Sequence, residues 1–277
     1  MSEEIKIPKA LLRPIGKALV EHDMIHDGDR VLLGLSGGKD SLSLLHILRH
    51  FQRHAPVKFE LGVMTVDPEI EGFDPGPLKA YVESLGLPYF YESHAIAEQA
   101  EEQMKNDSFC SFCSRMKRGI MYTTCRREGY NVLALAQHLD DLAESFLMSA
   151  FHGGQLRTMK ANYTNQDGDV RIIRPMVYVR ERQTADFAKT AEFPVIADSC
   201  PACFSMPTER QHMKELLAEH HKDVKPESHI SEKDDRVSSP DDLKKPVIDL
   251  SSVKEFAFDA EPESLIPLNA NLGGISL

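Results

Sequence analysis

A pair of glycines between an apolar run and an amphipathic helix constrains this chain most. Residues 31–36, VLLGLS, form a short continuous apolar run, which is typical of a strand buried on both faces. Residues 41–51, SLSLLHILRHF, have the apolar spacing of a helix. Gly37 and Gly38 between them allow a tight turn whose backbone N–H groups come close to an anion. The stretch GLSGGKDSL therefore predicts a strand, a phosphate-binding turn and a helix.

The side chains of this turn also suit phosphate chemistry. Lys39 supplies a point charge, Ser36 and Ser41 supply hydroxyls, and the helix adds its positive N-terminal end. A purely structural glycine turn is the alternative. The turn lacks the G-x-x-x-x-G-K-[ST] pattern that holds β and γ phosphates. SGGKDS resembles instead the PP-loop of the ATP pyrophosphatase superfamily, whose members cleave ATP between the α and β phosphates. The resemblance implies an ATP site at Ser36, Gly37, Gly38, Lys39, Asp40 and Ser41, with Lys39 and Asp40 catalytic.

Strand-like and helix-like segments alternate along the rest of the chain. The further strands are expected at 58–67, 87–92, 131–137 and, less clearly, 170–179. The further helices are expected at 8–25, 75–86, 114–129, 140–154, 181–192 and 207–221. This order predicts an α/β fold: an open, mostly parallel sheet with helices on both faces, plus small helical and cysteine-bearing additions.

Composition divides the chain into two parts. Residues 223–277 are rich in acids, Ser and Pro, and carry about half of the net charge of −11. We expect a PP-loop domain over residues 1–222 and an acidic, disordered tail over 223–277. No apolar run reaches the roughly 20 residues of a membrane-spanning helix, and the N-terminus lacks a signal-peptide pattern. A cytoplasmic protein without a membrane partner is therefore expected.

Polar side chains follow two of the expected strands. Asp67 ends the second strand, at the carboxyl edge where ligands of open α/β folds collect. The fourth strand runs into His138, Asp140 and Asp141, with Glu144 three residues further along one helical face. The structural alternatives are a helix cap for Asp140 and a solvated charge for Glu144. We predict that Asp67 and His138 bind ATP and that Asp141 binds Mg²⁺, a hard cation that prefers oxygen ligands.

The five cysteines include two C-x2-C pairs, at Cys110 and Cys113 and at Cys200 and Cys203. Four thiolates could close a tetrahedral zinc site, or some of them could hold an iron–sulfur cluster. The two-pair spacing alone favours zinc slightly. Cys125 lies in the middle of an expected helix and is interpreted as a small core residue.

The sequence around these pairs resembles the TtcA family of tRNA 2-thiocytidine synthases. The likeness covers roughly residues 8–220 and includes FCSFCSRMKRGIMYTTCRREG, AQHLDDLAES, VRIIRPMVYVRE and CPACFSMPTERQ. AQHLDDLAES also resembles the GHHxDD segment of PP-loop tRNA-modifying enzymes, from which it differs at Ala136 and Gln137. In that family three cysteines hold a [4Fe–4S] cluster and leave one iron without a protein ligand. By motif this implies Cys110, Cys113 and Cys203 as ligands, while the role of Cys200 stays open.

The resemblance implies an ATP- and Mg²⁺-dependent sulfurtransferase that adenylates an anticodon-loop cytidine of tRNA and introduces sulfur. A persulfide-bearing cysteine desulfurase is the expected sulfur donor, and a homodimer is left open. Basic residues in the acidic chain are candidates for RNA contacts. The selected candidates are Arg115, Lys117, Arg118, Arg174 and Arg180. Solvated helix charge is the alternative for about half of the basic residues in this region.

Three other functions compete with this interpretation. One is a PP-loop enzyme that modifies another tRNA base, although a lysidine synthetase would not need the cysteine pairs. The second is a zinc-stabilised adenine-nucleotide-binding protein without turnover. The third is a tRNA-binding scaffold.

Overall fold

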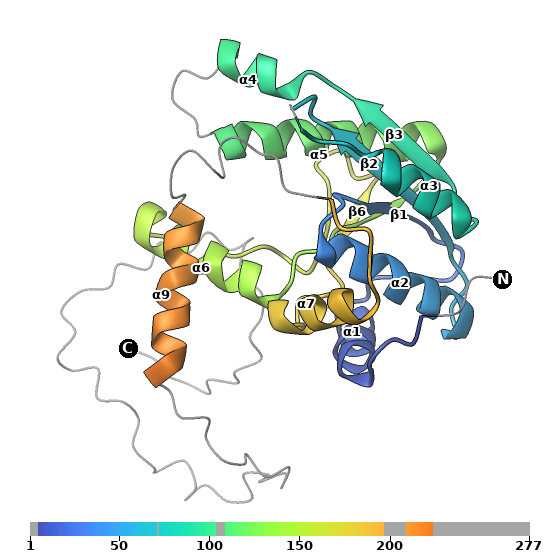
Figure 1. Ribbon diagram of the computed structural model, residues 1–277, viewed down its shortest axis with the longest axis horizontal. Coiled ribbons are helices and arrows are strands. Elements are labelled where there is room, and N and C mark those ends of the chain that lie inside the picture. The colour runs from blue at the N-terminus through green and yellow to red at the C-terminus, as the bar shows by residue number, and fades with distance from the viewer. Residues whose placement is uncertain (1–4, 71, 104–108, 197–208, 224–277) are drawn as a thin grey trace, which may run out of the picture. The chain divides into compact units, whose positions relative to one another are not determined.

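A computed structural model of the chain describes residues 5–70, 72–103, 109–196 and 209–223 (Figure 1). In these residues one sheet has the strand order β3-β2-β1-β4-β6-β5. The strands are β1 (Arg30–Gly34), β2 (Glu60–Asp67), β3 (Tyr89–Ser93), β4 (Val132–Ala134), β5 (Asn162–Thr164) and β6 (Arg171–Ile173). All neighbours are parallel except β5, which pairs with β6 in the antiparallel direction. This arrangement confirms the predicted open, mostly parallel sheet.

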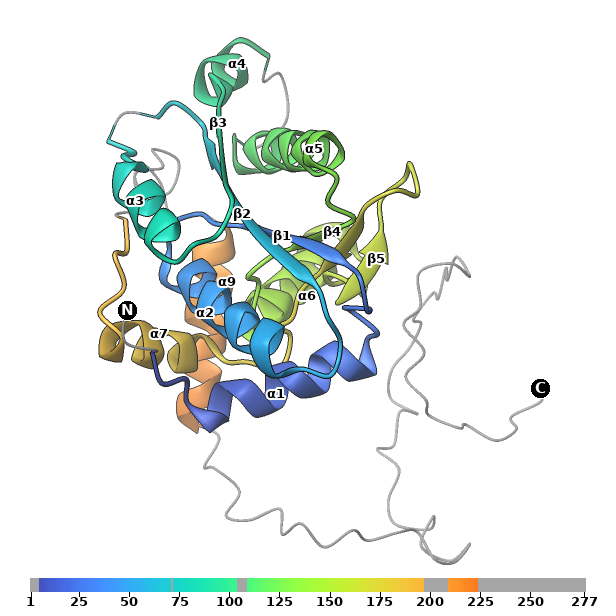
Figure 2. The ribbon, with the colours of Figure 1, turned by 90° about the vertical axis from the view of Figure 1, so that its right-hand side faces the viewer.

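Helices cover both faces of the sheet (Figure 2). They are α1 (Lys9–Glu21), α2 (Lys39–His54), α3 (Gly76–Ser84), α4 (Ile96–Gln103), α5 (Phe109–Glu128), α6 (Leu139–Gly153), α7 (Glu181–Thr190) and α9 (Glu209–Asp223). Helices α1, α2, α3 and α7 share one apolar core with the sheet, whereas α5 packs on the opposite face. Helix α9 packs against α6.

The central strand β1 shows why its sequence is continuously apolar. Val31 and Leu33 belong to the core beneath α2, and Leu32 between them belongs to the core beneath α5. All three side chains are fully buried, since successive strand residues point to opposite faces.

Several boundaries differ from the expected ones. Helix α5 begins at Phe109 rather than Ser114, which places the first cysteine pair on the helix. Strand β6 ends at Ile173, not Val179. Pro175, two residues later, has no N–H with which to extend a ladder. Strand β5 and helix α4 were not predicted.

The predicted domain boundary at residue 222 stays a prediction. Contacts group residues 1–224 into one compact unit, and residues 224–277 lie outside the described residues. Within the described part of the chain, no helix combines the length and apolar character needed to cross a bilayer.

Candidate functional site

The glycine turn lies between the end of β1 and the start of α2, as predicted. Its two serines hold the turn together. The Ser36 hydroxyl accepts from the Gly38 N–H at 3.3 Å, and the Ser41 hydroxyl accepts from the Ser36 N–H at 3.2 Å. Ser41 also donates to the Gly38 carbonyl at 3.0 Å. The N-terminal end of α2 therefore faces a loop whose shape is fixed by its own hydroxyls.

Gly37 occupies a position that no other residue fits without strain. Its φ is +86°, in the region that favours glycine. A Cβ there would lie 3.0 Å from Cδ1 of Ile196, and the Ile196 N–H donates to the Gly37 carbonyl at 3.0 Å. The segment that follows α7 thus lies directly on the loop.

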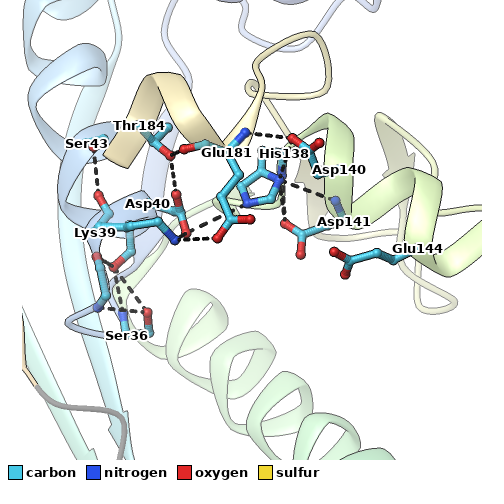
Figure 3. A network of polar contacts seen from close by, with 12 residues as sticks. Ser36, Lys39, Asp40, Ser43, His138, Asp140, Asp141, Glu144, Glu181 and Thr184 are labelled. Atoms are coloured by element: carbon cyan, nitrogen blue, oxygen red, sulfur yellow. Dashed lines mark hydrogen bonds and ion pairs between the residues drawn. The ribbon is translucent and has the colours of Figure 1, made fainter. Parts of the chain in front are cut away.

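Lys39 and Asp40 form the centre of a polar network (Figure 3). Lys39 Nζ lies 3.0 Å from Asp40 Oδ2 and 3.0 Å from Glu181 Oε1. Thr184 donates its hydroxyl proton to Asp40 Oδ1 at 2.5 Å. Burial alone would lower the pKa of Lys39, but the Asp40 and Glu181 carboxylates outweigh burial and raise it. The lysine is therefore a cation at neutral pH.

His138 caps the first turn of α6. The backbone N–H of His138 donates to Asp141 Oδ2 at 2.9 Å, and its ring Nδ1 accepts from the Asp141 backbone N–H at 3.3 Å. His138 Nε2 lies 3.9 Å from Asp40 Oδ2. Only 4% of His138 is exposed, and the residue lies between the start of α6 and Asp40 of the loop. Its predicted contact with ATP stays a prediction.

Asp140 connects α6 to α7. Its Oδ2 accepts from the Glu181 N–H at 2.6 Å, and its Oδ1 accepts from Arg180 Nε at 2.9 Å. Burial alone would raise the pKa of Asp140, but the Glu181 N–H and the Arg180 guanidinium lower it. Arg180, predicted to contact RNA, is thus bound to a carboxylate of the site.

Arg210 of α9 faces two carboxylates of α6. Arg210 Nη1 lies 3.6 Å from Asp141 Oδ1, and Arg210 Nε lies 3.6 Å from Glu144 Oε2. Glu144 is only 4% exposed, and burial raises its pKa. Its burial excludes the solvated surface charge considered for it from sequence.

The described residues contain no cluster of three or more His, Cys, Asp or Glu side chains arranged around one metal position. Mg²⁺ bound through a nucleotide needs only one or two carboxylates besides phosphate oxygens. Asp141, at the edge of the network, fits that smaller role. The predicted magnesium ligand therefore stays a prediction.

Asp67 ends β2 at the carboxyl edge of the sheet, as expected. Its Oδ2 accepts from the Tyr91 hydroxyl at 2.5 Å, and its Oδ1 accepts from the Glu69 N–H at 2.7 Å. The carboxylate thus shapes the turn after β2, and its predicted contact with ATP is not tested by this geometry.

The first cysteine pair lies in the first turns of α5. A helix N-terminus favours the thiolate form of cysteine. Cys113 is buried, whereas the Cys110 side chain, Cys200 and Cys203 lie outside the described residues. The predicted cluster ligands therefore stay predictions.

Helix α5 also fixes where this pair lies relative to the turn. Met121 of α5 packs at the end of β1, with its sulfur 3.2 Å from where a Cβ of Gly34 would be. Cys113 precedes Met121 by eight residues, or ~12 Å along the helix. Because α5 leads into the parallel strand β4, its N-terminus points to the carboxyl edge of the sheet, where the turn also lies. Cys125, by contrast, is fully buried, and burial raises the pKa of its thiol to about 12.

The basic residues of the chain differ in their surroundings. Arg115 and Arg118 are exposed on the first half of α5, and Lys117 beside them is partly exposed. Arg174 is only 4% exposed, and its guanidinium donates to Gln137 Oε1 at 3.0 Å and to the Lys160 carbonyl at 2.6 Å. This burial disfavours the predicted RNA contact of Arg174, because an RNA phosphate could not reach a guanidinium enclosed in this way.

Sequence reasoning did not identify four side chains of the site. They are Glu181, Thr184, Arg210 and Lys214. Lys39 and Glu181 are 142 residues apart, so only the packing of α2 against α7 brings them together. Glu181 is the last residue of the segment VRIIRPMVYVRE, a position that could have suggested it.

The chain matches a family model described as a PP-loop domain over residues 10–220, so the glycine turn and its network are the site of a PP-loop protein. It is 39% identical over 212 residues to the tRNA-cytidine(32) 2-sulfurtransferase of Geobacter sulfurreducens, covering 76% of this chain and 82% of that protein. It is also 39% identical over 216 residues to the enzyme of that name from Chromohalobacter salexigens, covering 77% of this chain and 75% of that protein. The chain therefore belongs to the family of tRNA-cytidine(32) 2-sulfurtransferases within the PP-loop proteins.

A solved structure shares the fold. The U34-tRNA thiolase NcsA from Methanococcus maripaludis, with its [4Fe-4S] cluster, superimposes with a TM-score of 0.63 at 24% identity, covering 77% of this chain and 72% of that one. This likeness supports the PP-loop architecture described above.

Proposed function

We propose that this chain is an ATP-dependent tRNA thiolase that converts an anticodon-loop cytidine to 2-thiocytidine. The observation that carries the proposal is the 39% identity to a tRNA-cytidine(32) 2-sulfurtransferase over 82% of its length. The intact glycine turn and its Lys39 network support the same reaction. The enzyme would work in the cytoplasm, where tRNA is found.

The first step of the proposed reaction uses the turn. The 2-oxygen of the cytidine attacks the α phosphorus of ATP, the bond to the β phosphate breaks, and pyrophosphate leaves. Lys39 and the N-terminal end of α2 would stabilise the negative charge that builds on the phosphates. Mg²⁺ held beside Asp141 would supply further positive charge.

The second step replaces oxygen with sulfur. A sulfur at the oxidation level of sulfide attacks C2 of the adenylated base, and AMP leaves with the former 2-oxygen. When the donor is a persulfide from a cysteine desulfurase, two electrons from a thiol reductant complete the transfer. A [4Fe–4S] cluster held by Cys110, Cys113 and Cys203 would supply a binding place for the incoming sulfur.

The described residues support the proposal that base activation and sulfur transfer take place close together. Residues 197–208 contain Cys200 and Cys203. Ile196, which precedes this segment, donates its backbone N–H to the carbonyl of Gly37. Glu209 follows the segment, and the next residue, Arg210, contacts the carboxylates of α6. Both ends of the segment with the second cysteine pair therefore lie at the PP-loop site.

The test combines nucleoside analysis with measurement of pyrophosphate. Expression of the chain in cells that lack 2-thiocytidine should restore this nucleoside in their tRNA, and Lys39→Ala should abolish it together with tRNA-dependent pyrophosphate release. Cys113→Ala should keep pyrophosphate release but lose thiolation, while Cys125→Ala serves as the control that keeps both. Thiolation of a uridine instead would refute the cytidine assignment.

Two further measurements address partners and metal content. Iron and sulfide in anaerobically purified protein would support the cluster, whereas stoichiometric zinc would favour the zinc-stabilised alternative. Sedimentation of the full chain would measure whether it forms the homodimer left open from sequence.

A further inference from the structure

Glu181 is shared by two lysines from distant parts of the chain. Lys39 of the turn contacts its Oε1 at 3.0 Å, and Lys214 of α9 contacts its Oε2 at 2.7 Å. Burial alone would raise the pKa of Glu181, but the hydrogen bonds from Lys214 and Lys39 outweigh burial and lower it to about 2. The carboxylate is therefore ionised at neutral pH and is balanced by both cations.

A phosphate that reaches Lys39 competes with this carboxylate for the same ammonium group. If Glu181 had no second partner, the transfer of Lys39 to phosphate would leave a half-buried carboxylate unpaired beside an incoming anion. Leaving a desolvated charge unpaired costs more than the original pair contributed. The free energy of phosphate binding would then be reduced by that cost.

We propose that Lys214 is a positioning residue for ATP: it neutralises Glu181 so that Lys39 can exchange the carboxylate for a phosphate. The inference rests on the ATP binding of the proposed function and deepens it. Lys214 acts through Glu181 and need not touch the nucleotide.

The position of Lys214 is well defined by its own helix. Met213, the preceding residue, is buried, and Arg210 one turn earlier contacts Asp141 and Glu144. Residues four apart lie on one helical face, so Arg210 and Lys214 approach the site together. Thr184, the fourth residue of α7, donates a hydrogen bond to Asp40, the other carboxylate partner of Lys39.

The test measures the dissociation constant of MgATP with the full chain by calorimetry at fixed ionic strength. Lys214→Met should weaken binding about fivefold, a modest effect because the Lys214 side chain is about half exposed. Lys214→Arg should restore binding. Lys189→Met is the matched control: it removes one exposed cation from the same helix as Glu181 and should leave binding unchanged.

A second background separates positioning from a structural role. In Glu181→Gln there is no carboxylate to neutralise, so adding Lys214→Met should change MgATP affinity by less than twofold. A fivefold loss that persists in this background, or wild-type affinity of Lys214→Met alone, would overturn the inference. If the wild-type chain bound no MgATP, the proposed function would fall as well, so the two failures are distinguishable.

Discussion

Replacement of Gly37 by alanine tests how the PP-loop is held in shape. The φ of +86° at Gly37 imposes a cost of ~1–2 kcal/mol on an L side chain. The new Cβ would also lie 3.0, 3.1 and 3.2 Å from Cδ1, Cγ1 and Cβ of Ile196. Overpacking of this kind costs ~1–3 kcal/mol, and the branched Cβ of Ile196 cannot rotate away from the new methyl group. We therefore expect Gly37→Ala to lower the free energy of unfolding by about 2–5 kcal/mol.

Urea denaturation of the full chain and calorimetry with MgATP measure the two consequences. Gly28→Ala is the control, because Gly28 has a similar φ of +83° but no heavy atom within 4 Å of the new Cβ. It should show only the backbone cost and bind MgATP normally. Adding Ile196→Ala to Gly37→Ala should give a favourable coupling of about 1 kcal/mol. Equal destabilisation by Gly37→Ala and Gly28→Ala, with unchanged MgATP binding, would refute the argument.

Three further predictions concern a buried guanidinium, a half-buried carboxylate and a buried thiol. Arg174→Ala should lower the free energy of unfolding by about 2–4 kcal/mol in urea, since it removes a buried guanidinium with two acceptors, whereas a pure RNA contact would leave stability unchanged. The pKa of Glu181 is lowered to about 2, so its ionised carboxylate stabilises the fold fully above the unfolded pKa of about 4.3, and this contribution is lost as pH falls through 2. Glu181→Gln should therefore weaken the fall in the urea midpoint between pH 5 and pH 2. Cys125, with a pKa of about 12, should resist iodoacetamide at pH 8 in the folded chain and react in urea, as peptide mass spectrometry would show.

The sheet could be predicted because its strands carry their own signal. Val31, Leu32 and Leu33 are apolar in succession, and only a strand covered on both faces buries all three. Strand β5 was missed because it has three residues, none of them buried. A signal did exist in Asp167 and Gly168, a turn pair that favours a hairpin.

The site could be predicted only where its residues are close in sequence. The turn from Ser36 to Ser41 is one continuous segment, so its local geometry follows from glycine, serine and the helix start. The partners of Lys39 depend on the packing of α7 and α9, which no spacing encodes. The burial of Arg174 could not be predicted for the same reason, because a basic residue at a strand end gives no sign of whether its guanidinium is buried.

The basic residues at the end of α5 are paired with carboxylates. Arg126 pairs with Asp167 and Asp169, and Arg127 pairs with Glu92 and Glu128, so these two arginines carry little unbalanced charge.

The first half of α5 contains Arg115, Lys117 and Arg118, which directly follow Cys113. Because α5 runs opposite to the parallel strands, this end of the helix points to the same sheet edge as the glycine turn. We propose that tRNA binds along these basic residues, next to the first cysteine pair and the ATP site, as base activation followed by sulfur transfer requires.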